Sequence, residues 1–142
     1  MVAQLLVGSA LISASIVIEA VFVGAAWVTL GRIGPWLGTP VRAPRVILML
    51  VVTTLWMMAA HGLSVWVWAL AFLWLDIFHE LEPALYFSVV AFTTLGFGDV
   101  LLPQEWRLLA GLSAANGLLI FGVSTAFLVE VFRRVGDDNF TR

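Results

Sequence analysis

Three apolar runs constrain the fold of this chain more than any other feature of its sequence. They cover about residues 3–30, 46–75 and 104–135. A helix needs about 20 apolar residues to cross the hydrocarbon core of a bilayer, and each run is longer than that. Because 62% of the residues are hydrophobic and only 11% are charged, a soluble domain of 142 residues could not bury so much apolar surface. The sequence therefore predicts an all-α integral membrane protein.

The first run is expected to remain as a transmembrane helix and not to be cleaved as a signal peptide. Its opening residues, Met1 to Gln4, include no basic side chain, and the run is longer than the apolar part of a signal peptide. It has no repeated arginine, so a voltage sensor of the usual kind is not expected either. Two roles stay open, namely packing on the lipid-facing side of the other spans or contact with a neighbouring subunit.

Basic residues indicate how the spans are oriented. Most of them lie in the linker after the first run or at the C-terminal end: Arg32, Arg42, Arg45, Arg133, Arg134 and Arg142. The segment between the second and third runs is acidic instead. The positive-inside rule therefore predicts a cell-membrane protein with the linker and the C-terminus in the cytoplasm and the N-terminus outside. The arginines form no clustered basic face, so nucleic acid is not an expected partner.

A shorter apolar segment, residues 83–93, lies between the second and third runs. It is too short to cross a bilayer and suits a re-entrant helix. Glu82 and Pro83 favour a helix start, since an acid stabilises the positive end of the helix dipole and proline fits the first turn. The segment then runs into Thr-Thr-Leu-Gly-Phe-Gly-Asp at 93–99. Irregular backbone at this depth must be buried in protein or line a watery cavity.

Residues 94–99 resemble the Thr-Val-Gly-Tyr-Gly-Asp selectivity filter of the potassium channel pore-domain family. Glycine permits dihedrals that let successive carbonyls point the same way and replace the water shell of a cation. The resemblance covers about residues 46–135 and implies an outer helix, a re-entrant pore helix with the filter, and an inner helix, preceded by one additional N-terminal transmembrane helix. Leu95 and Phe97 depart from the family pattern, and Phe97 lacks a hydroxyl that could brace the filter. The alternative is that the two glycines only form a turn between helices.

The resemblance implies that K⁺ is the bound and transported ion. Its ligands would be the backbone carbonyls of Thr94, Leu95, Gly96 and Phe97. The Thr94 hydroxyl would join them, Gly98 would open the outer mouth, and Thr93 and Asp99 would support the filter. Some bacterial members pair this aspartate with a pore-helix carboxylate, but Val90 stands at the matching position here. That pair is therefore not expected, and no cofactor other than K⁺ is implied.

The third run carries features that the resemblance assigns to an inner helix. Four residues on one helical face match the family's cavity-lining positions: Leu118, Phe121, Thr125 and Val129. Gly117 and Gly122 fall where the family has hinge and packing glycines, and the sequence leaves both roles open.

One chain holds one filter motif, whereas a closed ring of carbonyls needs four, so the resemblance implies a homotetramer. The predicted organisation is an extra helix with a cytoplasmic linker at 1–45, an ion-channel pore domain at 46–136 and a short cytoplasmic tail at 137–142. The implied function is K⁺-selective passage across a membrane, with lipid as the surroundings and no soluble protein partner. The alternatives are a non-selective cation channel and a non-conducting subunit or scaffold. No His, Asp or Glu cluster has catalytic spacing, so an enzyme is not expected.

Two titratable residues lie in the middle of apolar runs. Glu19 is central in the first run and His61 in the second, so antiparallel helices would place them at a similar depth. A carboxylate at that depth is unfavourable and usually faces protein or water. We hypothesise that the two side chains hydrogen-bond across the helix interface and make the packing of the first span respond to pH. The alternative is a protonated Glu19 bonded to a serine or a backbone carbonyl, with a neutral His61 elsewhere.

Overall fold

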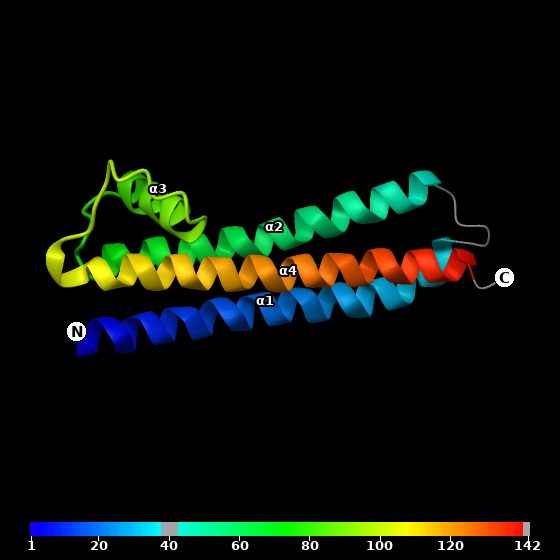
Figure 1. The fold of residues 1–142 in the computed structure, drawn as a ribbon, viewed down its shortest axis with the longest axis horizontal. Coiled ribbons are helices and arrows are strands. Elements are labelled where there is room, and N and C mark those ends of the chain that lie inside the picture. Colours follow the sequence, from blue (N-terminus) through cyan, green and yellow to red (C-terminus); the bar gives the residue numbers. More distant parts are fainter. Residues whose placement is uncertain (38–42, 141–142) are drawn as a thin grey trace.

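The computed structural model describes the backbone of residues 1–37 and 43–140 and the side chains of residues 1–32 and 43–133. These residues are helical over most of their length (Figure 1). In chain order the elements are α1 (Val2–Leu37), α2 (Ala43–Trp74), α3 (Leu81–Phe92), the short 3-10 helix η1 (Gln104–Trp106) and α4 (Arg107–Phe140). The described part of the chain therefore has the all-helical composition that the apolar runs predict.

Three of the helices are long and apolar enough to cross a membrane, over Val2–Arg32, Ala43–Trp74 and Gln104–Arg133. They correspond to the three predicted spans and confirm that the chain has the make-up of a multi-pass membrane protein. α1 and α4 run in the same direction, and α2 runs in the opposite one (Figure 1). The N-terminus, α3 and the start of α4 therefore share one end of the bundle, while the C-terminal end of α4 lies at the other.

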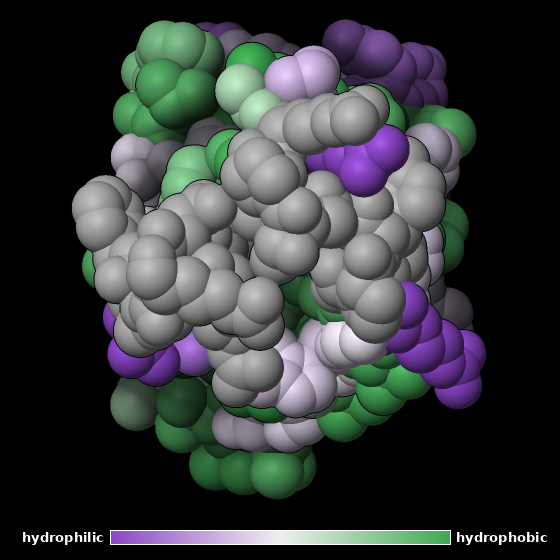
Figure 2. Space-filling view, turned by 90° about the vertical axis from the view of Figure 1, so that its right-hand side faces the viewer, coloured by the Kyte–Doolittle hydropathy of each residue, from purple (hydrophilic) through white to green (hydrophobic). Residues whose placement is uncertain are grey.

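The surface of the bundle is apolar along the three long helices. Large side chains such as Val17, Leu55 and Leu119 are 61, 64 and 66% exposed. Seen from the end that carries the C-terminus, hydrophobic residues extend along the sides and hydrophilic residues lie around that end (Figure 2). Such a surface suits lipid, because soluble proteins rarely expose large contiguous apolar areas.

The helices are longer than the apolar runs predict. α1 continues through Pro35 to Leu37, into the predicted linker, and α4 continues to Phe140, into the predicted tail. Proline removes a hydrogen bond and usually ends a helix in water, but membrane helices tolerate it where neighbouring groups satisfy the freed backbone. Residues 38–42 and 141–142, which belong to the predicted linker and tail, lie outside the described residues.

α3 is the predicted half-crossing helix, 12 residues long, and it packs against α2 and α4. An aromatic core holds it in place. The Phe87 ring centroid lies 5.4 Å from that of Phe72 and 5.6 Å from that of Phe78, and Phe72 is fully buried. Aromatic pairs of this kind contribute about 0.5–1.5 kcal/mol each beyond the area they bury. This core sets where the chain leaves α3.

α1 packs against both α2 and α4 of its own chain. The Gln4 side chain donates to the carbonyl of Glu105 and accepts from the N–H of Leu108 at 3.2 Å, which caps the start of α4. One turn later Gly8 lies so close to α4 that a Cβ would collide with Leu112. These contacts anchor the first helix along α4 within a single chain.

Candidate functional site

The irregular chain after α3 begins with residues 93–99, which we call the glycine segment. α3 ends with Thr93 as its C-cap, and the chain then turns back on the helix end. The N–H groups of Leu95 and Gly96 donate to the carbonyl of Val90 at 3.0 and 3.3 Å. These bonds use a carbonyl that a helix end would otherwise leave free, and they fix the segment relative to α3.

Every second residue of the glycine segment has a positive φ. The angle is 61° at Thr94, 57° at Gly96 and 78° at Gly98. Left-handed backbone is readily adopted by glycine, whereas at Thr94 it is a strained conformation. Successive carbonyls of an ordinary strand point in opposite directions, but alternation of left-handed with other residues turns them toward one side. Gly96 and Gly98 adopt this backbone without strain, whereas Thr94 occupies the left-handed position of a helix-ending turn, since its N–H donates to the carbonyl of Ala91.

The carbonyl oxygens of this segment have no partner inside the chain. Among the described residues, no hydrogen-bond donor reaches the carbonyl oxygens of residues 94–98. The side chains are open as well, with Leu95 57% and Phe97 66% exposed. Backbone carbonyls are nearly always satisfied by protein, water or a ligand. The glycine segment therefore combines backbone carbonyls that have no partner within the described residues with two large, exposed apolar side chains.

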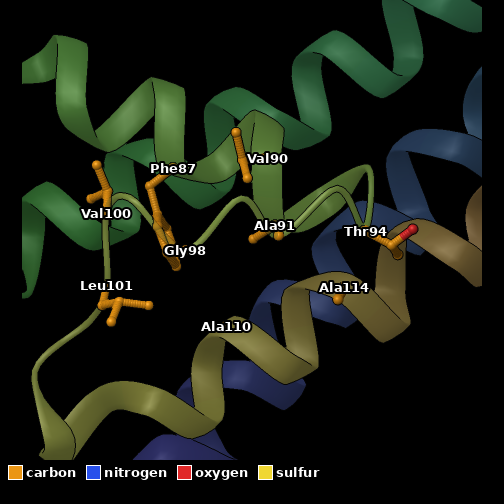
Figure 3. Close-up of a pocket in the computed structure, with 10 residues that line it drawn as sticks. Phe87, Val90, Ala91, Thr94, Gly98, Val100, Leu101, Ala110 and Ala114 are labelled. Carbon is orange, nitrogen blue, oxygen red and sulfur yellow. The ribbon is translucent and has the colours of Figure 1, made fainter.

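A pocket of about 240 Å³, with a mainly apolar lining, lies beside the glycine segment. α3, the segment and α4 all contribute to it, among others through Val90, Ala91, Thr94, Gly98, Ala110 and Ala114 (Figure 3). Figure 3 shows the segment passing between α3 on one side and α4 on the other. On the α4 side the lining consists of the small side chains of Ala110 and Ala114.

Tyr86 of α3 holds Asp99 at the end of the glycine segment. Its hydroxyl donates to Asp99 Oδ2 at 2.6 Å, and the Val100 N–H donates to Oδ1 at 3.1 Å. The bond from Tyr86 holds the pKa of Asp99 below its usual range, and the same bond raises the pKa of the Tyr86 hydroxyl. The sequence points to Val90 as the matching position, and so misses a tyrosine one turn earlier on the same helix face.

The two threonines of the segment differ in what they contact. Thr93 turns its hydroxyl back into α3, where it donates to the carbonyl of Val89 at 2.7 Å. Thr93 therefore supports the helix end from which the segment starts. Thr94 is exposed in the single chain and lines the pocket.

Three of the four predicted cavity-lining residues of α4 are exposed in the single chain. Leu118 is 65% and Val129 60% exposed, and Thr125 is exposed as well. Phe121 differs, because its half-buried ring lies 4.6 Å from the His61 ring. The first three residues thus share an open face, while Phe121 is turned toward the interior of its own chain.

Gly117 is a close-packing position. A Cβ there would collide with the backbone carbonyl of Phe92, the last residue of α3. α4 is one continuous helix from Arg107 to Phe140, and nothing lies within 4 Å of the place that a Cβ on Gly122 would take. The sequence leaves open whether these glycines act as a hinge or as packing positions. The structure supports packing at Gly117, and it requires neither role at Gly122.

Glu19 and His61 lie close together, with a third residue between them. His61 Nε2 is 3.9 Å from Glu19 Oε2. Ser124 of α4 donates to Glu19 Oε1, and its oxygen lies 2.8 Å from His61 Nε2. A bridge through Ser124 therefore takes the place of the hypothesised direct hydrogen bond. The alternative hypothesis expected Glu19 to bond to a serine and His61 to lie away from it. The serine bond is present, but His61 lies beside Glu19.

Within the described residues, no group of three or more His, Cys, Asp or Glu side chains could hold a metal ion. The carbonyl oxygens of residues 94–98 have no hydrogen-bond partner within the described residues. A protein-family model described as an ion channel matches residues 46–134, which is more than half of the chain. The chain belongs to this ion channel family.

The matched region of the channel begins near the start of α2 and ends within α4, so it contains α3 and the glycine segment. α1 precedes the matched region. Searches against curated proteins and against solved structures gave no significant match. Family membership assigns ion passage to the channel, and the identity of the ion has to be argued from geometry.

Proposed function

We propose that this channel conducts K⁺ selectively through a filter to which each of four chains contributes the carbonyls of Thr94 to Phe97. The observation that carries the proposal is the alternation of positive φ at Thr94, Gly96 and Gly98, in a segment whose carbonyls have no internal partner. Carbonyl oxygens that point to one side can replace the hydration shell of K⁺. The Thr94 hydroxyl would add one more oxygen, and Gly98 would lie at the outer mouth.

A homotetramer accounts for the open surfaces of the single chain. One segment can face an ion from one side only, so four copies are needed to surround it. Leu95 and Phe97 are more than half exposed, next to a mainly apolar pocket. Neighbouring chains would cover these surfaces in the tetramer. The open face of α4, with Leu118 and Val129, would then border a central cavity below the filter.

The dipole of α3 favours a cation in that cavity. The C-terminal end of α3 carries the negative end of the helix dipole, and the glycine segment starts there. In the tetramer, four such helix ends would converge below the filter. They would stabilise a cation without any fixed charge in the ion path.

We assign the filter end of the bundle to the outside of the cell membrane. Arg32, Arg45 and Arg133 lie toward the opposite end, and the positive-inside rule places that end in the cytoplasm. Because α1 and α4 both start at the filter end, this assignment puts the N-terminus outside and the C-terminal end of α4 in the cytoplasm.

The test compares K⁺ with Na⁺ flux in liposomes that contain the purified chain. We expect K⁺ flux to exceed Na⁺ flux roughly tenfold or more, which a discrimination of about 1.4 kcal/mol would produce. Native mass spectrometry should give the mass of four chains. Equal fluxes would indicate a non-selective cation channel, and no flux of either ion would indicate a non-conducting subunit or scaffold. Either result would overturn the proposal.

A further inference from the structure

A buried polar junction lies in the middle of the three long helices. It consists of Glu19 of α1, His61 of α2 and Ser124 of α4, which are 3, 8 and 4% exposed. The helices are apolar around it, and a carboxylate at this depth persists only where other groups stabilise it. The polar junction joins α1, which lies outside the family match, to the two long helices inside that match.

The hydrogen bonds of the polar junction run in one direction. Ser124 donates its hydroxyl hydrogen to Glu19 Oε1. A hydroxyl has only one hydrogen to donate, so the Ser124 oxygen accepts from His61 Nε2, which lies 2.8 Å away. Nε2 therefore carries a hydrogen whether the imidazole is neutral or charged.

Two atoms of the polar junction, Glu19 Oε2 and His61 Nδ1, are buried without a hydrogen-bond partner among the described residues. One titratable proton can reside on either atom. On Nδ1 it gives an imidazolium with a carboxylate, and on Oε2 it gives a neutral imidazole with a carboxylic acid, so the net charge is zero in both cases. A second proton, or the loss of the first, leaves a net charge in an apolar interior. The polar junction is therefore most stable with one proton.

No other titratable side chain of the described residues lies close to the polar junction. On α1 and α2 the next ones are Arg32 and Arg45, each about 20 Å or more away along its helix at about 1.5 Å per residue. On α4, Glu130 follows Ser124 at about 9 Å along the axis, and its carboxylate forms an ion pair with Arg133. The charge of the junction thus depends on its own members.

The polar junction also contacts a row of packed rings that leads to the glycine segment. The His61 ring lies 4.6 Å from Phe121 of α4, and the Phe121 ring lies 5.9 Å from Phe92. Phe92 directly precedes the glycine segment. On α3 the nearest titratable group is Tyr86, six residues before Phe92, which bonds to Asp99 and not to the junction. A displacement of His61 can therefore reach the filter through contiguous side chains.

We propose that the polar junction is a proton-dependent lock between α1 and α4, and that pH acts on ion conduction through it. This rests on the proposed ion path along α4 and not on K⁺ selectivity. When locked, the junction holds one proton. When opened, it exposes a carboxyl and an imidazole to water, where side chains of these kinds have ordinary pKa values of about 4.3 and 6.5. Between these values the open junction also holds one proton, so the lock is independent of pH there.

Linkage gives the sign of the effect outside this window. Above about pH 6.5 the open junction loses the proton that the locked junction keeps, so the lock weakens as the pH rises. Below about pH 4.3 the open junction takes up a second proton, so the lock weakens as the pH falls. Each effect reaches at most about tenfold per pH unit in the ratio of locked to open molecules.

Single substitutions should move this window in opposite directions. In Glu19→Gln the lone imidazole has to be neutral to stay buried, so the lock weakens below about pH 6.5 and is constant above it. In His61→Gln the lone carboxyl has to be protonated, so the lock weakens throughout the range above about pH 4.3. The double variant has no titratable group in the junction and should be independent of pH. Glutamine keeps a hydrogen-bonding group at each position.

The test measures thermal unfolding and ion flux of the full chain in liposomes between about pH 4 and about pH 9, which brackets both groups. It compares the wild type with the two single variants and the double variant. Glu130→Gln removes the next carboxylate of α4 and is the matched control, so it should follow the wild type. We expect the unfolding temperature to fall over the pH range given for each variant, and flux to change about threefold or more over that same range.

Identical pH profiles in the wild type and both single variants would overturn the proposal. Unfolding profiles that shift as expected, with flux that ignores pH, would also overturn it, because the junction would then be only structural. If the wild type carries neither K⁺ nor Na⁺ at any pH, the proposed function fails and the regulatory role fails with it. Opposite shifts of the two unfolding profiles would in that case still support the lock, so the two failures are distinguishable.

Discussion

The glycine segment and the polar junction place polar atoms in an apolar protein in opposite ways. The segment exposes backbone carbonyls that have no partner among the described residues. The junction uses side chains that are more than nine-tenths buried and bonded to one another. The junction therefore forms its contacts within one chain, whereas the segment leaves its carbonyls without a partner there. The function of the segment should depend on backbone geometry, and that of the junction on protonation.

Gly96→Ala should have the largest effect. It tests whether the function of the glycine segment depends on its backbone geometry. A φ of 57° is unfavourable for alanine by about 1–2 kcal/mol, and relief of that strain would turn a carbonyl away from the ion. We expect K⁺ flux into liposomes to fall about 100-fold or more, which corresponds to about 2.7 kcal/mol.

The matched control is Gly24→Ala in α1. Gly24 is helical, and nothing lies within 4 Å of the place that its Cβ would take. This variant should keep wild-type flux. Undiminished and still selective K⁺ flux in Gly96→Ala would exclude the filter that we assign to the glycine segment.

The glycine segment also shows what could be predicted from the sequence. The three helices long enough to cross a membrane and the short helix α3 follow from the lengths of the apolar runs. Positive φ at Gly96 and Gly98 follows from glycine at alternate positions. The ends of α1 and α4 did not follow, because signals that end helices in water are weaker at a membrane.

The side-chain bonds at both sites were less predictable, for a common reason. The Tyr86–Asp99 bond depends on how α3 is rotated relative to the chain that returns from it. Ser124 joins the polar junction only because α1 and α4 run in parallel with one register. Helical periodicity gives the residues that share a face, but it does not give the face of another helix that they meet. The similar depth of Glu19 and His61 could be predicted, because it depends only on their positions along two antiparallel helices.

Gly117→Ala should have the next largest effect and tests how the end of α3 is positioned. The new Cβ would collide with the Phe92 backbone carbonyl, so a helix has to shift. Overpacking of this kind destabilises proteins by about 1–3 kcal/mol. We expect a lower unfolding temperature together with reduced K⁺ flux, since the glycine segment starts one residue later.

Gly122→Ala is the control for this pair, because its Cβ would meet nothing within 4 Å. Alanine favours a helix by up to about 1 kcal/mol over glycine, so this variant should be as stable as the wild type or more stable. If Gly117→Ala matched Gly122→Ala in both measurements, close packing of α3 on α4 would not be what positions the segment.

Tyr86→Phe should make the filter more sensitive to acid, with a smaller effect. The bond from Tyr86 holds the pKa of Asp99 below its usual range. The Asp99 carboxylate therefore stabilises the folded protein at pH values above the ordinary aspartate pKa of about 3.9. This stabilisation is lost as the pH falls through the lower pKa that Asp99 has in the folded protein. Without the hydroxyl the pKa of Asp99 returns toward its ordinary range, so K⁺ flux should begin to fall at a higher pH than in the wild type.

A series of fluxes at acidic pH measures this shift, and the alkaline side serves as an internal control. Tyr86 makes no contact with the polar junction in the described structure, so the change in flux above about pH 6.5 should match the wild type. If Tyr86→Phe changed the flux only at alkaline pH, the Tyr86–Asp99 bond and the polar junction would not act independently of each other.

The smallest effect should come from the open face of α4, measured as block by a quaternary ammonium ion from the cytoplasmic side. Leu118 is 65% exposed in the single chain and should contact the blocker, so Leu118→Ala should weaken block about threefold to tenfold, the effect of losing about one methylene contact at about 0.8 kcal/mol. Leu119→Ala is the matched control, because Leu119 is 66% exposed but points about a quarter-turn away on the helix.

Phe121→Leu should leave block nearly unchanged and alter the pH profile instead, because the Phe121 ring contacts His61. Block that responds to Phe121 and not to Leu118 would mean that α4 is rotated in the tetramer, and the cavity face would have to be reassigned.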